Sequence, residues 1–303
     1  MIRNKGVCCI VLGLEDNDPP LKFKTITYKS FSSLPREEAL VKLGDVILNN
    51  LLVTEKAIEY CGINGHNYRL SSNIFPLLTY EKANVAFSDL PQENIIWQYV
   101  DKIKLTRELH NVRISSHPDQ FNVLASESVD SVTRTIRELD FQGWFMTRIG
   151  CPKNYDAPIN IHVNRSGKDG QVFLVKDLFY ENFHRLTADV KLRLVLENDD
   201  KAAGWTVRDL YNHFYGDGDT PITFDYLHHK CHNCGYHEEE AFDMAASSWR
   251  NHVPLFHYSE SIPGDKNPRK HADYAVKLPH TYNTTIDLDF EFKMKEKSFE
   301  SLC

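Results

Sequence analysis

No apolar run in the sequence reaches the roughly 18 to 20 residues that a membrane span requires. The longest early run, Val7–Leu14, is short and is followed by two acidic residues. Arg3 and Lys5 precede it as in a signal peptide, but no small-residue cleavage site lies before the acidic pair. We therefore expect a buried first strand, no membrane partner, and an intracellular location that is cytoplasmic or nuclear.

Paired cysteines, linker tracts and an excess of positive charge are missing as well. The 7 cysteines are an odd number at irregular spacings, which suits reduced thiols rather than a disulfide framework. No stretch rich in Pro, Gly or Ser is long enough to separate two domains, so we expect one domain over residues 1–303. The 42 acidic residues exceed the 35 lysines and arginines, and the net charge is −7. A nucleic-acid partner would therefore need a local basic patch or bound cations.

The sequence does contain short apolar runs that alternate with segments of helical periodicity. The runs are Val7–Leu14, Tyr68–Leu70, Val112–Ile114, Ile159–Val163, Leu192–Leu196, Ile222–Phe224, Val253–Phe256 and Thr285–Leu288. Their continuous apolarity is typical of strands in a parallel sheet that is covered on both faces. The helical segments are Pro35–Tyr60, Gln92–Leu109, Ser131–Ile149, Val175–Leu186, Thr206–Phe214 and Glu238–Arg250.

This alternation predicts an α/β fold, a single (β/α)8 TIM barrel that forms one catalytic domain. An open, doubly wound parallel sheet is the less favoured alternative. The last segment, Lys293–Leu302, is interpreted as a closing helix.

Histidines and carboxylates stand at the ends of six of these runs. They are His117, His162, Glu197, Asp225 with His228 three residues later, His257 and Glu291. Because the carboxyl ends of all barrel strands converge on one face, we expect these side chains to meet. Buried carboxylates would repel one another without cations, and mixed imidazole and carboxylate donors suit zinc, manganese or iron. The set predicts a metal site at the carboxyl-terminal ends of the strands, although each residue alone is more often a capping or hydrogen-bonding group.

Two other segments have a structural and a metal-related interpretation. Asn198 and Asp199 follow Glu197 and either form a simple turn or orient the ligand histidines. Cys231 and Cys234 are spaced as one half of a structural zinc site, but the sequence lacks the second pair. Local packing of the loop is therefore the favoured interpretation of the two cysteines.

Two further segments could contact a nucleic acid. Gln120 and Phe121 are either a packed loop pair or a wedge directed at a base. Lys266 and Arg269 are either solvated or contact phosphates beside His271. Position alone does not decide between these interpretations.

Several motifs are informative in combination. They are Tyr68–Asn73, Ser115–Phe121, Ile159–Val163, Leu196–Asp200, Phe224–His229, His257–Ser259 and His271–Tyr274. Together they resemble the UV damage endonuclease family, and the likeness extends over most of the chain after about residue 65. Members of that family are TIM barrels related in shape to apurinic endonuclease IV. They bind up to three divalent metal ions and nick DNA immediately 5′ of pyrimidine dimers, 6-4 photoproducts and abasic sites.

The resemblance implies roles for individual residues. The implied metal ligands are His117, His162, Glu197, Asp225, His228, His257, His271 and Glu291. Of these, Glu197 would bridge two ions and Glu291 would lie near the nucleophilic water, so both are expected to be catalytic. Gln120 and Phe121 would probe the lesion. The expected metal is manganese, with zinc, cobalt and magnesium as alternatives, and the expected partner is damaged double-stranded DNA bound by a monomer.

Three positions depart from the family pattern. Val7 and Phe121 stand where tyrosines are common, and Leu255 stands where several members have a lysine that can be carboxylated. Metal chemistry is therefore better supported than lesion preference.

Two rival functions remain open from the residues alone. A metal-dependent TIM-barrel sugar-phosphate isomerase would use similar strand-end residues but would not need Gln120 and Phe121. A non-enzymatic zinc-binding interaction module would depend on Cys231 and Cys234.

Overall fold

The computed structural model describes residues 1–300 and Leu302. Its 8-stranded sheet is parallel and has the order β6-β5-β4-β3-β2-β1-β8-β7. The strands are β1 (Ile2–Cys8), β2 (Asn67–Leu70), β3 (Ile114–Ser116), β4 (Ile159–Ile161), β5 (Leu194–Glu197), β6 (Ile222–Thr223), β7 (Leu255–Tyr258) and β8 (Ile286–Phe290). A parallel bridge from Asp225, just after β6, to His257 in β7 joins the two edges into a nearly closed barrel. The predicted TIM-barrel fold is confirmed.

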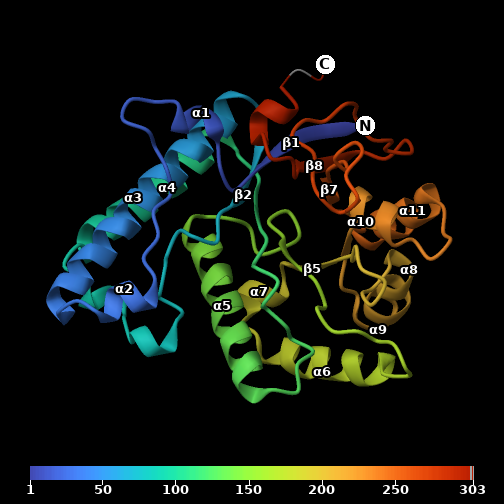
Figure 1. Cartoon of the computed structure of the whole chain (residues 1–303), viewed down its shortest axis with the longest axis horizontal. Coiled ribbons are helices and arrows are strands. Elements are labelled where there is room, and N and C mark those ends of the chain that lie inside the picture. Colours follow the sequence, from blue (N-terminus) through green and yellow to red (C-terminus); the bar gives the residue numbers. More distant parts are fainter. Residues whose placement is uncertain (301, 303) are drawn as a thin grey trace.

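Helices surround the strands and cover the outside of the barrel (Figure 1). The longer ones are α3 (Arg36–Ile63), α4 (Glu93–His110), α5 (Val129–Arg148), α6 (Val172–Arg185) and α11 (Glu238–Ser248). The shorter ones are α1 (Leu12–Glu15), α2 (Tyr28–Ser32), η1 (Glu81–Ala83), η2 (Phe87–Asp89), α7 (Ala188–Lys191), α8 (Val207–Leu210), η3 (Tyr211–Tyr215), α9 (Gly216–Gly218), α10 (Tyr226–Cys231) and η4 (Lys295–Ser298). No helix within the described residues is long and apolar enough to cross a membrane.

The sequence pattern explains the elements that pack against the barrel. In α3, buried Leu43, Ile47 and Leu51 recur every four residues and so lie on one helix face. The helix α4 ends where Asn111 adopts a left-handed conformation with φ 50°, which a short polar side chain tolerates. Every residue of β2, β5, β7 and β8 is buried, because helices cover the strands outside and side chains fill the barrel inside.

A buried ion-pair network closes the amino-terminal end of the barrel. Asp287, near the start of β8, has a completely buried side chain. Arg3 donates from Nε and Nη2 to its two carboxylate oxygens at 2.8 and 2.5 Å. Arg113, just before β3, donates from Nη1 to Oδ2 at 2.8 Å. Burial alone would raise the pKa of Asp287, but the two guanidiniums outweigh burial and lower it.

Two predicted segment boundaries are wrong. The first strand is Ile2–Cys8 rather than Val7–Leu14, because Cys9 has a positive φ of 67° and the chain then turns into α1. The predicted closing helix Lys293–Leu302 is only the short 3-10 turn η4 within its described part. Lys295 has a positive φ of 48°, which a regular α-helix does not accommodate.

Candidate metal centre

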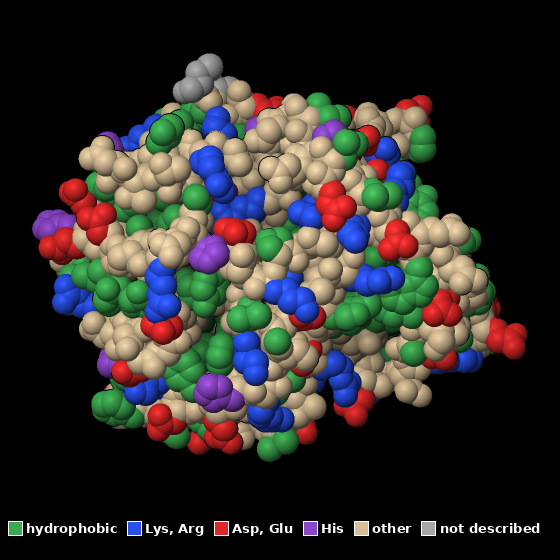
Figure 2. Space-filling view, turned by 180° about the vertical axis from the view of Figure 1, so that it is seen from behind, with side chains coloured by type: hydrophobic (Ala, Val, Ile, Leu, Met, Phe, Trp, Pro, Cys, Tyr) green, Lys and Arg blue, Asp and Glu red, His purple; other side chains and the backbone are tan. Residues whose placement is uncertain are grey.

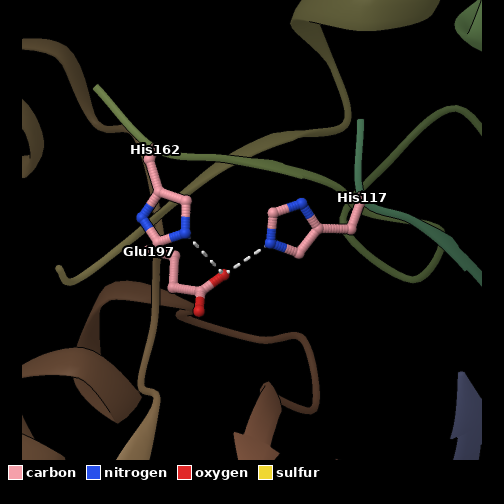
Figure 3. A group of neighbouring side chains, drawn as sticks. All are labelled: His117, His162 and Glu197. Atoms are coloured by element: carbon pink, nitrogen blue, oxygen red, sulfur yellow. Dashed lines mark hydrogen bonds and ion pairs between the residues drawn. The ribbon is translucent and has the colours of Figure 1, made fainter. Parts of the chain in front are cut away.

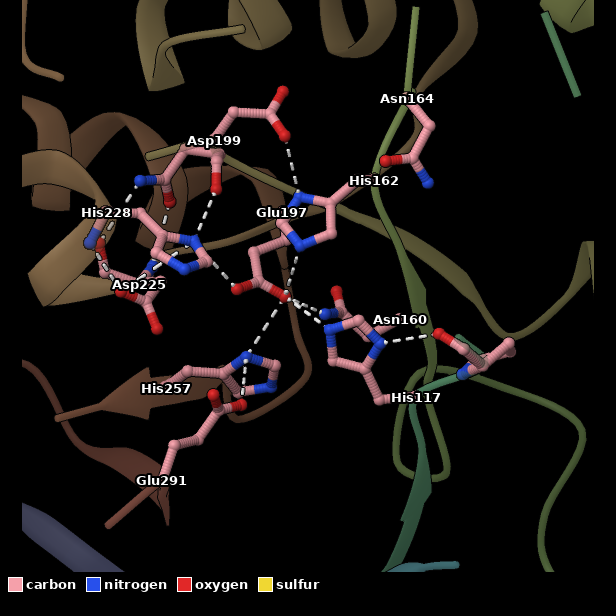
Figure 4. A network of polar contacts seen from close by, with 12 residues as sticks. His117, Asn160, His162, Asn164, Glu197, Asp199, Asp225, His228, His257 and Glu291 are labelled. Atoms are coloured by element: carbon pink, nitrogen blue, oxygen red, sulfur yellow. Dashed lines mark hydrogen bonds and ion pairs between the residues drawn. The ribbon is translucent and has the colours of Figure 1, made fainter. Parts of the chain in front are cut away.

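The carboxyl-terminal ends of the strands bring seven of the predicted donors together (Figure 4). His117, His162 and Glu291 directly follow β3, β4 and β8, whereas Glu197 and His257 lie within β5 and β7. Asp225 follows β6 and His228 lies one turn later in α10. Each donor therefore owes its position to the register of a barrel strand or of the turn that follows it.

The donors form three groups in which the possible ligand atoms lie within 4.8 Å of one another. The first donor group is His117, His162 and Glu197, the second is Glu197, Asp225 and His228, and the third is Asp225, His257 and Glu291. Glu197 belongs to the first two groups and Asp225 to the last two. The three groups are thus linked by shared carboxylates, as expected for ligands that bridge neighbouring ions.

Glu197 lies at the centre of this arrangement, and its side chain is only 1% exposed. Its Oε2 lies 2.9 Å from Nε2 of His117 and 3.7 Å from Nε2 of His162 (Figure 3). The same oxygen accepts a hydrogen bond from Nδ2 of Asn160, and Oε1 lies 3.2 Å from Nδ1 of His228. Burial would raise the pKa of Glu197, but the surrounding imidazoles outweigh it and hold that pKa well below its ordinary value.

Asp225 is completely buried and is not fully satisfied by the protein. Its Oδ1 accepts a hydrogen bond from the backbone N–H of His228 at 2.6 Å, whereas its buried Oδ2 has no hydrogen-bond partner among the described residues. Burial raises the pKa of Asp225. An unpartnered, buried carboxylate oxygen beside imidazole nitrogens is the donor chemistry that a divalent cation satisfies, so the residues present fit a metal ion.

Neighbouring groups hold the histidine rings in place. Nδ1 of His162 lies 3.1 Å from Oδ1 of Asp199, which directs Nε2 of this ring towards Glu197. Nδ1 of His117 lies 3.0 Å from the carbonyl oxygen of Pro118, with the same effect. Although burial favours the neutral ring, Glu197 and Asp199 raise the pKa of His162 to about 9. Such outer contacts fix the ring orientation that metal ligation needs.

Asn198 anchors the loop that carries two of the donors. Its side chain accepts from the backbone N–H of Asp225 at 2.8 Å and donates to the carbonyl oxygen of Asp225 at 3.1 Å. Its own carbonyl oxygen lies 2.9 Å from Nδ1 of His228. Asn198 and Asp199 therefore do more than form a turn, since they contact three of the predicted donors between them.

A cavity of about 590 Å³ opens above the donors. Its lining includes His117, Gln120, His162, His228 and Glu291. The cavity is a solvent-accessible space in which a substrate can reach the donor groups.

Phe121, next to Gln120, is 78% exposed. Of the two interpretations of Gln120 and Phe121, the packed loop pair is therefore wrong for Phe121. An aromatic side chain that is exposed to this extent and that follows a residue of the cavity wall in the sequence is available for contact with a partner.

The remaining predicted site residues lie elsewhere. Nδ1 of His271 lies 2.5 Å from the carbonyl oxygen of Glu291, but His271 belongs to none of the three donor groups. Lys266 and Arg269 line a separate open groove together with Asp200 and Lys201, and these last two residues also line the central cavity. Figure 2 shows that cationic and anionic side chains are interspersed over the face it displays, in agreement with the absence of a uniformly basic surface.

The cysteine segment does not form a metal site in the part of the chain that the structure describes. Sγ of Cys234 lies 3.3 Å from Nε2 of His232, but neither Cys231 nor Cys234 joins a group of three donors. The zinc-binding module therefore has no structural support.

Sequence reasoning missed Arg69 and Asn160, which both touch the donor groups. Arg69 contacts Glu291 and Asn160 contacts Glu197. Both lie inside strands, and the only sequence signal was a polar residue within an otherwise apolar run.

Comparisons with known proteins give consistent results. The family model described as UV-endonuclease UvdE matches residues 4–303. The UV DNA damage endonuclease of Bacillus thuringiensis subsp. konkukian (strain 97-27) is 31% identical over 98% of this chain and 92% of its own length. The crystal structure of SacUVDE has 27% identity and a TM-score of 0.78, covering 97% of this chain and 94% of that chain.

A more distant structure shares the fold alone. Endonuclease IV from Thermus thermophilus has 16% identity and a TM-score of 0.52, covering 78% of this chain and 87% of that chain. The family match over nearly the whole length, together with the relatives that align end to end, is decisive: this chain belongs to the UV-endonuclease UvdE family.

Proposed function

We propose that this protein is a metal-dependent endonuclease that nicks DNA immediately 5′ of UV photoproducts and of abasic sites. The photoproducts are pyrimidine dimers and 6-4 photoproducts, and the products are a 3′ hydroxyl and a 5′ phosphate. Its family makes the chain a DNA repair endonuclease. The observation that carries the finer proposal is the set of three donor groups linked by Glu197 and Asp225.

The seven clustered donors would hold up to three divalent cations, and His271 would join them from the side of Glu291. We expect manganese, as the resemblance to the UV damage endonuclease family implies, and zinc, cobalt or magnesium would be alternatives. Donors that mix imidazole nitrogen with carboxylate oxygen are compatible with manganese and with zinc. Bound cations would lower the pKa of a coordinated water and neutralise the phosphoryl oxygens of the scissile bond.

The protein's own side chains have distinct tasks in this proposal. Glu197 is a shared ligand, since it is the buried carboxylate common to the first two donor groups. Glu291 stays ionised, because Arg69 and His257 outweigh its burial and hold its pKa well below the ordinary value. An ionised Glu291 that lines the cavity can accept a hydrogen bond from the attacking water.

Damage recognition would depend on groups at the cavity rim. Phe121 is exposed and could fill the gap that a displaced base leaves, with Gln120 beside it in the cavity wall. A second cavity of about 210 Å³ shares Asp119 with the central one, and its lining combines Phe75, Phe141 and the amide of Gln142. Aromatic faces with an amide at the edge suit an unstacked base.

Backbone binding would depend on the open groove beside the central cavity. Lys266 and Arg269 line this groove, and Lys201 lines both hollows. A DNA strand that passes from one hollow to the other would meet these cations at its phosphates, so binding should weaken steeply as the salt concentration rises.

A nicking assay tests the proposal. Purified protein with Mn²⁺ is incubated with a duplex that carries one photoproduct, and with the same duplex undamaged. We expect a single cut immediately 5′ of the lesion and almost none in the undamaged strand. Intact damaged strands would reject the endonuclease, and equal cutting of both duplexes would reject the selectivity for damage.

A further inference from the structure

A buried arginine lies against the third donor group. Arg69 is in β2, and its side chain is 9% exposed. Its Nη1 donates to Oε1 of Glu291 at 2.5 Å and lies 3.5 Å from Nε2 of His257. Two of the three donors in this group therefore contact a guanidinium, which stays charged at any pH at which the protein is folded.

Within the described part of the chain, no guanidinium contacts the first two donor groups in this way. Among the described residues, the side chains in contact with the Glu197 carboxylate are those of Asn160 and four histidines, and none of these carries a permanent charge. The partners of Asp225 are backbone groups, the amide of Asn198 and His228. Among the described residues, no permanently charged side chain in contact with these carboxylates therefore competes with a divalent cation for them.

The backbone of Arg69 is fixed in the barrel. In the sheet register it pairs with Cys8 of β1 on one side and with Ser115 of β3 on the other. The side chain lies inside the barrel and lines the cavity wall next to Glu291. The guanidinium is therefore part of the site and not a mobile surface charge.

We propose that Arg69 is a positioning residue that supplies a fixed positive charge at the third donor group. It holds Glu291 in place and neutralises it, so that the centre binds two divalent cations tightly and a third only weakly. This inference rests on the proposed metal-dependent function. The physical reason is that a cation at the third group has to share Glu291 with a guanidinium and is repelled by it, and in a buried site such charges are poorly screened.

Titration of the metal-free protein with Mn²⁺ tests the inference without any DNA. Free Mn²⁺ is measured by its EPR signal for the wild type and for Arg69→Met and Arg69→Lys. In the wild type, the third dissociation constant should be at least about tenfold weaker than the second. Arg69→Met should strengthen the third constant about tenfold or more, whereas Arg69→Lys keeps the charge and should stay close to the wild type.

Arg113→Met is the matched control, because it removes a buried guanidinium at the opposite end of the barrel and should leave all three constants unchanged. Circular dichroism at the titration temperature shows whether each variant is folded. Even if Arg69→Met does not fold, the wild-type constants still test the inference, since three sites of equal affinity would overturn it while leaving the metal centre intact. An unchanged third constant in folded Arg69→Met, or a Lys variant that behaves like the Met variant, would also overturn it. A wild type that binds no Mn²⁺ at all would remove the metal centre itself.

Discussion

The two ends of the barrel bury carboxylates in opposite ways. At the amino-terminal end, Asp287 is matched by two arginines, and both of its oxygens accept hydrogen bonds from them. At the carboxyl-terminal end, three carboxylates share one arginine and four histidines, and Oδ2 of Asp225 has no partner among the described residues. At the first end the buried carboxylate has enough cationic partners within the protein, whereas at the second end the carboxylates outnumber the permanently cationic side chains and leave room for added cations.

The pKa shifts of Asp287 and Asp225 reflect this difference, whereas at the carboxyl-terminal end Arg69 and the histidines keep the pKa values of Glu197 and Glu291 low. Burial raises the pKa of both Asp287 and Asp225. At Asp287 the arginines outweigh burial and the pKa falls, whereas at Asp225 burial prevails and the pKa rises. A buried carboxylate that the protein does not itself stabilise in the charged form is suited to a ligand that brings its own positive charge. The comparison indicates that the amino-terminal network contributes to stability, whereas the carboxyl-terminal donor groups are suited to binding a cation.

The largest expected effect is the loss of activity in Glu197→Gln. This change removes the carboxylate shared by the first two donor groups, so nicking should fall at least about a thousandfold, which corresponds to about 4 kcal/mol. Because no volume is lost, the variant should fold. The assay is nicking of a photoproduct duplex with Mn²⁺, and Glu181→Gln, an exposed change on α6, should keep full activity. Retained activity in Glu197→Gln would refute its role as a shared ligand.

Asp287→Asn should lower the stability of the protein and leave the activity of the folded fraction intact, which is the opposite of the result expected for Glu197→Gln. Loss of the buried charge leaves Arg3 and Arg113 without their shared carboxylate and should lower the free energy of unfolding by about 3 to 5 kcal/mol. The folded fraction should still nick damaged DNA. Urea denaturation measures the stability, and Asp177→Asn, at an exposed position on α6, should change it by less than about 0.5 kcal/mol. A stable Asp287→Asn variant without activity would contradict the assignment of stability to the amino-terminal end and of activity to the carboxyl-terminal end.

The contribution of Asp287 should also depend on pH. Its pKa is lower in the folded chain than the ordinary value of about 3.9, so its stabilisation is complete above that value and is lost as the pH falls through the folded pKa. The difference in unfolding free energy between wild type and Asp287→Asn should therefore shrink as the pH falls below about 4. A difference that is the same at low and neutral pH would contradict this assignment.

Metal binding should stabilise the protein only through the donor groups at the carboxyl-terminal end of the barrel. Free Mn²⁺ at a hundred times its dissociation constant should raise the free energy of unfolding by about 2.7 kcal/mol per site, and EDTA should remove this gain and stop nicking. Thermal unfolding with and without Mn²⁺ provides the measurement. The gain should be unchanged in Asp287→Asn and greatly reduced in Glu197→Gln. An equal gain in both variants would place the bound metal outside the donor groups.

The smallest predicted effect concerns the rim. Phe121→Ala should reduce nicking at a photoproduct about tenfold, since an exposed aromatic that stacks on a base contributes about 1 to 3 kcal/mol. The affinity for Mn²⁺ should not change, because Phe121 is not a donor. Phe173→Ala is the matched control, as Phe173 is 67% exposed on α6. Equal nicking by the two variants would remove Phe121 from damage recognition.

Most of the fold could be predicted because most strands of the sheet are buried along their whole length. Buried runs such as residues 194–196 are therefore apolar and stand out in the sequence. The start of β1 could not be predicted, since it contains Arg3 and Lys5, whose charges are satisfied by Asp287 and by the carbonyl oxygens of Phe299 and Leu302. Those partners are almost 300 residues away in the sequence.

The site was predictable to the extent that strand ends define it. His117, His162 and Glu197 come together because parallel strands in register deliver them to one face. The place of Arg69 was not predictable, because its role depends on pairing across the barrel with Glu291. Local sequence shows only a charged residue within a strand.

The most direct test of the shared metal centre is a crystal structure of the protein grown with Mn²⁺, with the ions located by their anomalous scattering. We predict Mn²⁺ peaks on both sides of the Glu197 carboxylate, one beside His117 and His162 and the other beside Asp225 and His228. Fully loaded crystals with no peak in contact with Glu197 would contradict the account.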